Sequence, residues 1–203
     1  MANCLQIIAI ICILITTVAT IVSFATPNWL NFRINDSQQM TGRVCECFSN
    51  NCDCGLWLNC KSGATASGSL DNCLWFFADE FKIEKNLPEW FKAVQGLMSC
   101  AVASSMLALI IGLISLCWTC KGCNSNAATG AFANLTFLLL AVSVCVFGAK
   151  AYMSEEAEVI TSKSVTESVI LFGWSFWVAV GATGMSLIAS ILYFCVGRSD
   201  KYD

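Results

Sequence analysis

Cysteines are the residues in this sequence whose chemistry and spacing stand out. The chain of 203 residues contains 14 cysteines and no histidine. An even number of cysteines in a loop with little core of its own is typical of disulfides formed in an oxidising compartment. A zinc site of four thiolates is the alternative, but it would require the reducing cytosol. We therefore predict disulfides and no metal for the cysteines between residues 45 and 73, which are Cys45, Cys47, Cys52, Cys54, Cys60 and Cys73.

Catalysis is not expected from the remaining thiols. Acyl transfer at Cys120 or Cys123 would need a base that activates the thiolate, and histidine, the usual base, is absent. We expect a protein without enzymatic activity, without catalytic residues and without a cofactor.

The composition indicates a membrane protein. Hydrophobic residues make up 57% of the chain and charged residues only 12%, which is more apolar surface than a soluble domain of this size can bury. The net charge is −3 and no run of Lys or Arg occurs, so nucleic acid is not an expected partner. The lipid bilayer is the expected surrounding.

Four uncharged stretches are long enough to cross this bilayer, because a spanning helix needs about 20 apolar residues. The absence of ionisable side chains within them argues against a proton relay, a voltage sensor or a transport site in the membrane. We predict one four-span domain with both termini on the same side. Its spans are 5–24, 93–118, 127–149 and 168–196, and its other segments are the long loop 25–92, the turn 119–126, the second loop 150–167 and the tail 197–203.

A signal peptide is an alternative for the first stretch, because Ser23 and Ala25 have the spacing that signal peptidase recognises. However, no positive charge precedes the stretch, and its apolar run exceeds the ~7–15 residues of a signal peptide. We predict a retained helix.

Cysteines and a glycosylation sequon orient the chain. The six loop cysteines place residues 25–92 outside the cell, and the sequon at Asn35 agrees with that side. Both termini are then cytoplasmic. Cys117, Cys120 and Cys123 lie where the second span leaves the membrane on the cytoplasmic side and are candidates for palmitoylation. Alternatively, they serve as small hydrophobic residues near the membrane surface.

The long loop also contains short strand-like runs, in which aromatic and β-branched residues lie between turn formers. These runs are 28–34, 42–48, 54–60 and 72–78. In the spans, small residues recur at four-residue intervals, a spacing that lets helices approach closely in lipid. They are Ser104, Ala108 and Gly112 on the second span, and Ala182, Ser186 and Ser190 on the fourth.

These residues carry a resemblance to a known family. Trp29, the triplet Gly55-Leu56-Trp57, Cys60 and Cys73 reproduce the W…GLW…C…C signature of the claudin and peripheral myelin protein superfamily. The segments 87–98 and 172–184 resemble its peripheral myelin and epithelial membrane protein branch.

The resemblance implies a mainly α membrane protein, with a left-handed four-helix transmembrane bundle and a small extracellular antiparallel β-sheet. It implies a disulfide between Cys60 and Cys73, and it implies that Trp29, Leu56 and Trp57 anchor the sheet at the membrane surface. The implied function is cell adhesion and a paracellular barrier at plasma-membrane junctions, with like proteins as partners in cis and in trans. The alternative is an auxiliary or trafficking subunit of an ion channel or receptor.

Three features depart from the claudin pattern. First, Gln95 stands where claudins usually have arginine. Second, the tail ends in Asp203 rather than in a hydrophobic residue, so a PDZ scaffold is not expected as a partner. Third, the long loop carries four cysteines besides Cys60 and Cys73, and these four can pair in three ways. Our preferred hypothesis is a hairpin in which 45–47 pairs with 52–54, with disulfides Cys47–Cys52 and Cys45–Cys54.

Overall fold

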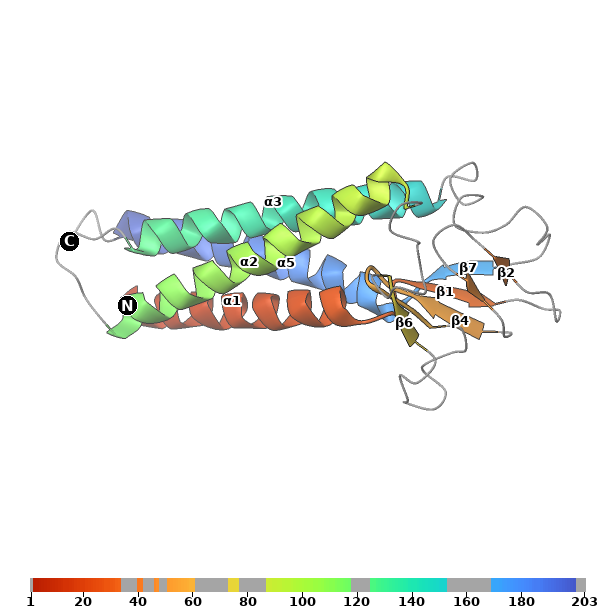
Figure 1. Cartoon of the computed structure of the whole chain (residues 1–203). Coiled ribbons are helices and arrows are strands. Elements are labelled where there is room, and N and C mark those ends of the chain that lie inside the picture. Colours follow the sequence, from red (N-terminus) through yellow and green to blue (C-terminus); the bar gives the residue numbers. More distant parts are fainter. Residues whose placement is uncertain are drawn as a thin grey trace. The chain divides into compact units, whose positions relative to one another are not determined.

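The computed structural model describes residues 2–33, 40–41, 46–47, 51–60, 73–76, 87–117, 125–152 and 169–199. Within these segments, four helices are long and apolar enough to cross a membrane. The prediction of a mainly helical four-span membrane protein is therefore confirmed. The helices are α1 (Ala2–Ala25), α2 (Glu89–Cys117), α3 (Ser125–Tyr152) and α5 (Trp174–Ser199) (Figure 1).

Short strands occupy the loops, as predicted. In the described part of the chain, five of them form an antiparallel sheet in the order β6-β5-β4-β1-β7, and β2 pairs separately with β3. Their bounds are β1 (Leu30–Arg33), β2 (Met40–Thr41), β3 (Glu46–Cys47), β4 (Asn51–Cys54), β5 (Leu58–Cys60), β6 (Cys73–Trp75) and β7 (Val169–Phe172).

Two predictions about these elements are wrong. The fourth span does not begin at residue 168, because Val169–Phe172 forms β7 beside β1 and the helix begins at Trp174. The run 54–60 is not one strand, because β4 ends at Cys54 and residues 55–57 form a turn. The hairpin is not found at the residues that the structure describes: β3 pairs with β2, and β4 pairs with β1 along its length and with β5 at Asp53 and Cys54. Residues 45 and 48–50 of the predicted hairpin lie outside the described residues.

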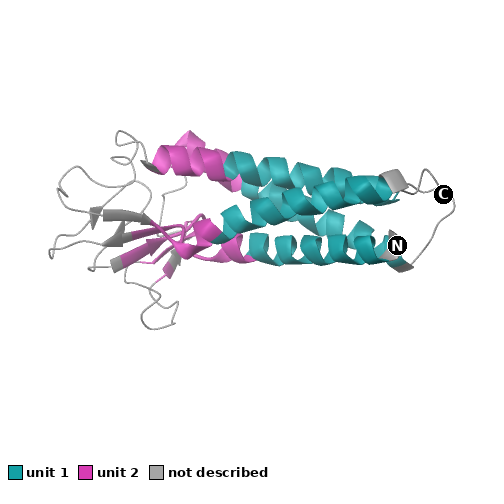
Figure 2. Cartoon of the chain, turned by 180° about the vertical axis from the view of Figure 1, so that it is seen from behind, with its two compact units in different colours: residues 1–21, 97–143, 178–203 teal, residues 22–96, 144–177 magenta. Residues whose placement is uncertain are grey.

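The chain divides into two compact units, which Figure 2 colours separately: residues 1–21, 97–143 and 178–203, and residues 22–96 and 144–177. The first unit is a helical core to which α1, α2, α3 and α5 all contribute. Small residues dominate this core, with Ala9, Ala108, Ala133 and Ala189 almost fully buried around Tyr193. Small side chains let the helices approach closely where the hydrophobic effect cannot drive their association.

Most of the small residues predicted to pack lie inside this unit. Ala108, Ala182 and Ser186 are buried, whereas Ser190 lies on the wall of a groove described below. The hydroxyl of Ser104 donates to the carbonyl of Phe132 at 3.0 Å, and Thr136 donates to the Ser104 oxygen at 3.1 Å. These bonds link α2 to α3, and they satisfy polar groups that would be costly in hydrocarbon.

The second unit holds the sheet and an aromatic core. Trp29 packs edge-on against Phe147 with ring centroids 4.7 Å apart, and Phe147 also contacts Phe91 and Phe176. Edge-to-face contacts of this kind add to the energy of burying the rings. The sheet is therefore held by side-chain packing as well as by the disulfides.

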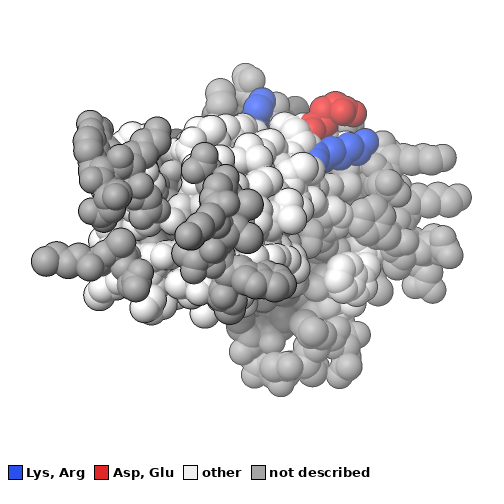
Figure 3. All heavy atoms as spheres, turned by 90° about the vertical axis from the view of Figure 1, so that its left-hand side faces the viewer, with Lys and Arg blue, Asp and Glu red and all other residues white. Residues whose placement is uncertain are grey.

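Charged side chains are scarce in the described helices. Glu89 and Lys92 lie in the first turn of α2 and form an ion pair at 3.8 Å, and Lys150 lies in the last turn of α3. Figure 3 shows a face on which the described surface is almost free of acidic and basic side chains. This distribution fits helices whose middle parts lie in hydrocarbon.

Candidate functional site

The Gly-Leu-Trp triplet forms the turn between β4 and β5. The amide of Gly55 donates to the carbonyl of Leu58 at 2.8 Å, and the carbonyl of Trp57 accepts the amide of Phe76 at 3.0 Å. A Cβ at Gly55 would lie 2.6 Å from the Cα of Pro27. No side chain fits at that distance, so the close approach of two backbones requires glycine here.

Leu56 is held from two directions. Its side chain is fully buried, and its carbonyl accepts a hydrogen bond of 2.6 Å from the side-chain amide of Gln95 on α2. The next residue, Trp57, packs against Phe24 near the end of α1, with ring centroids 5.2 Å apart. The turn therefore connects the sheet to two helices within the second unit.

Trp29 lies inside the protein. Its side chain is 0% exposed, and its indole N–H donates to the carbonyl of Ser23 at 2.8 Å. Protein atoms therefore surround the side chains of Trp29 and Leu56. That Trp29, Leu56 and Trp57 anchor the sheet at the membrane surface stays a prediction. An indole serves equally well in an aromatic core when its N–H finds an acceptor.

A second junction, which sequence analysis missed, joins the start of α5 to the end of α1. The Ser23 hydroxyl donates to the carbonyl of Ser175 at 2.8 Å, and the hydroxyls of Thr26 and Ser175 lie 2.7 Å apart. The backbone amide of Ser175 lies in the first turn of α5, where amides have no acceptor within the helix. It donates instead to the carbonyl of Asn28. Gly173 packs so closely on Asn28 that a Cβ would overlap its carbonyl. The only sequence signal was the glycine itself.

A disulfide joins Cys60 and Cys73, as the resemblance implied. The two residues are directly opposite in the ladder between β5 and β6. Among the described strands, β6 is at one edge of the sheet, and its Trp75 side chain is 56% exposed. An edge strand offers unpaired backbone groups to another chain, so this part of the sheet is the candidate contact site.

Cys52 and Cys54 on β4 are also disulfide-bonded, and both are buried. The side chains of their predicted partners, Cys47 and Cys45, are not among those that the structure describes. The disulfides Cys47–Cys52 and Cys45–Cys54 therefore stay predictions. Asn35, Cys120 and Cys123 also lie outside the described residues, as does the side chain of Cys117. In the described helices, Cys4 and Cys195 are free and exposed.

Among the described residues, no group of three His, Cys, Asp or Glu side chains could hold a metal ion. The buried acid in the sheet, Asp53, accepts a hydrogen bond of 2.7 Å from the Asn31 amide on the neighbouring strand β1. That contact links strands β1 and β4.

Four spans and a disulfide-linked sheet that contains the Gly-Leu-Trp turn define a class of multi-pass membrane proteins. The sequence matches the family described as PMP-22/EMP/MP20/Claudin tight junction over residues 7–195, and the chain belongs to this family. Among curated proteins, none matches the sequence.

Proposed function

We propose that this protein acts at contacts between cells, where its disulfide-linked sheet faces the intercellular space and meets a like chain on the neighbouring cell. The observation that carries this proposal is the family match across both units. The Cys60–Cys73 disulfide beside the exposed Trp75 supports it, because a covalently braced strand at the sheet edge loses little flexibility on binding. The plasma membrane, cytoplasmic termini and a role in a paracellular barrier belong to the same proposal.

Cell mixing tests the proposal. Two populations of cells without junctions express the chain, each with a tag of a different colour. They are cultured with one another and, separately, with non-expressing cells. We expect enrichment where two expressing cells meet and none at contacts with non-expressing cells. Trp75→Ala should reduce the enrichment, whereas Trp177→Ala, which changes an exposed tryptophan on α5, should not.

Even distribution over the membrane would overturn the adhesion proposal. The alternative function, an auxiliary subunit of an ion channel or receptor, predicts that even distribution together with co-purification of one channel or receptor. The same cells therefore distinguish the two functions.

A further inference from the structure

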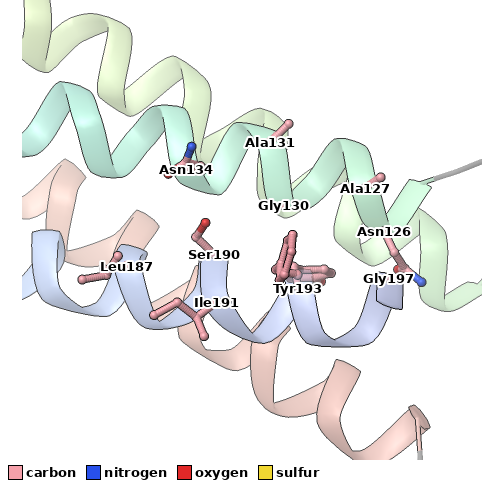
Figure 4. Close-up of a pocket in the computed structure, with 11 residues that line it drawn as sticks. Asn126, Ala127, Gly130, Ala131, Asn134, Leu187, Ser190, Ile191, Tyr193 and Gly197 are labelled. Carbon is pink, nitrogen blue, oxygen red and sulfur yellow. The ribbon is translucent and has the colours of Figure 1, made fainter. Parts of the chain in front are cut away.

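The first unit contains an open groove and an inner cavity. The groove lies between α3 and α5, has a volume of about 1020 Å³ and carries Asn134 and Ser190 on its walls (Figure 4). The cavity lies inside the unit, because every residue that lines it is buried. Its volume open to the centre of a water-sized sphere is about 10 Å³. A space of about 10–15 Å³ by this measure holds one water molecule, so the size of the inner cavity fits a single water.

Hydroxyl groups from all four helices surround the inner cavity. Four of its eight lining residues are alanine or isoleucine, and none is charged. The other four are Thr16 of α1, Ser105 of α2, Thr136 of α3 and Ser186 of α5. A metal cation would lack a balancing charge there, and ions are costly within hydrocarbon. A small neutral polar molecule is therefore the kind of ligand that this cavity can take.

These hydroxyls lie near the middle of the membrane. The middles of the four spans fall at residues 14–15, 102–103, 138 and 185–186. Each hydroxyl residue is within three residues of the middle of its own span, which is about 4 Å at 1.5 Å per residue. Hydrocarbon extends roughly 15 Å to either side of that level, so bulk water and lipid headgroups do not reach it. A polar ligand at this depth must be held by the protein itself.

Each of the four hydroxyls donates its hydrogen to a carbonyl of its own helix. The acceptors are the carbonyls of Cys12, Val102, Phe132 and Thr183, at distances of 2.8–2.9 Å. Thr136 shares its hydrogen with the Ser104 oxygen. A hydroxyl oxygen also has two acceptor lone pairs, so the hydroxyls around the cavity offer acceptors while their hydrogens are already used. Bonds to a helix's own backbone form without a neighbouring helix, so they do not explain why four hydroxyls meet at one place.

We propose that the inner cavity binds one water molecule, which donates one hydrogen to the Ser186 oxygen and the other to a hydroxyl oxygen of another helix. Water fits a wall of acceptors, because it brings two donors in the volume of one oxygen atom. Thr17 joins α1 to α2 by donating to the Ser105 carbonyl at 3.3 Å, and Thr136 joins α3 to α2. Ser186 donates within α5, so the water connects its helix to this network.

Nuclear Overhauser effects (NOEs) from water to methyl groups test the site directly. The full-length chain, with labelled alanine and threonine methyls, is reconstituted in phosphatidylcholine nanodiscs. We expect NOEs from water at the methyls of Ala133 and Thr16, which line the cavity. The methyl of Ala9 is buried in the same core but is not among the lining residues, and it should show none.

Thr20 controls for hydrogen exchange at the hydroxyls. Its side chain is also buried and its hydroxyl donates to the Thr16 carbonyl at 2.7 Å, but it is not among the residues that line the cavity. A hydroxyl hydrogen that exchanges with solvent would produce a signal at both threonines alike. NOEs of equal strength at Thr16 and Thr20, or no NOE at Ala133 and Thr16, would overturn the water site.

The variant Ser186→Ala tests the link to α5. It should remove most of the NOE intensity at Ala133. It should also lower the melting temperature roughly 2–4 °C more than Ser143→Ala does, which is the shift expected for one further hydrogen bond in a chain of this size. Ser143 is the matched control, because it is buried and donates to the Leu139 carbonyl of its own helix at 2.8 Å, but does not line the cavity.

Unchanged NOEs in Ser186→Ala, together with equal melting temperatures for the two variants, would overturn the bond to Ser186. If Ser186→Ala does not fold, the NOEs at Thr16, Thr20 and Ala133 in the unchanged chain still decide whether the cavity binds water.

Discussion

At the scale of single residues, the Gly-Leu-Trp signature has a steric and a polar explanation. Gly55 lets the turn touch the backbone that leaves α1, and Leu56 offers its carbonyl to Gln95. Neither contact depends on a ligand or on a partner. The triplet is therefore explained by the fold, and in the proposed function it would act indirectly, through the placement of β5 and β6.

Gly55→Ala should destabilise the protein. The new Cβ would lie 2.6 Å from the Pro27 Cα, and backbone atoms cannot move aside as a flexible side chain can. Forced overpacking of this kind costs about 1–3 kcal/mol, which a lower melting temperature in detergent would report. Gly96→Ala is the matched control, because a Cβ there meets no atom within 4 Å. Equal melting temperatures for the two variants would contradict the steric explanation.

Gln95→Met should weaken the attachment of the turn to α2. Methionine has a similar length but no N–H, so the buried Leu56 carbonyl would lose the 2.6 Å bond that Gln95 donates to it. Leaving such a group unpaired costs about 1–3 kcal/mol. Hydrogen exchange of residues 55–58 should become faster, while exchange in the first unit stays the same. Unchanged exchange in the turn would show that the bond contributes little.

At the scale of elements, the disulfide sets the stability of the sheet edge. The ladder between β5 and β6 has only three residue pairs, and strands so short are marginal without a covalent link. Closing a loop of 13 residues contributes about 3 kcal/mol in the chain-entropy account.

The double variant Cys60→Ala/Cys73→Ala should therefore lose protection from hydrogen exchange in β5 and β6 and keep it in the helices of the first unit. Cys195→Ser, which changes an exposed free cysteine, controls for the loss of a thiol. If β5 and β6 stay protected in the double variant, packing around Phe76 and Phe91 holds the edge without the disulfide.

Sequence patterns predicted the helices well and the junctions poorly. In a bilayer, a long uncharged run must satisfy its backbone hydrogen bonds within itself, and a helix does so. The uncharged runs therefore predicted all four spans. The apolar run 169–172 directly precedes a span, so hydropathy alone could not separate strand β7 from helix α5. The burial of Trp29 and the bond from Gln95 to Leu56 depend on contacts between distant segments, which no local pattern reveals.

At the scale of the whole molecule, the even number of spans predicts that both termini share one side of the membrane. Tags at residues 1 and 203 should bind antibody only after the plasma membrane is permeabilised. Asn35→Gln should remove a glycan, because the loop between α1 and α2 would then be outside the cell.

Loss of the tag at residue 1 from the mature protein would instead indicate cleavage near Ala25. Cleavage would remove the whole α1 contribution to the core of the first unit, which is Ala9, Ile10, Cys12 and Ile13, and the four-helix unit would then not form. A tag at residue 203 that binds antibody on intact cells would invert the proposed orientation and place the disulfide-linked sheet in the reducing cytosol, where disulfides do not persist.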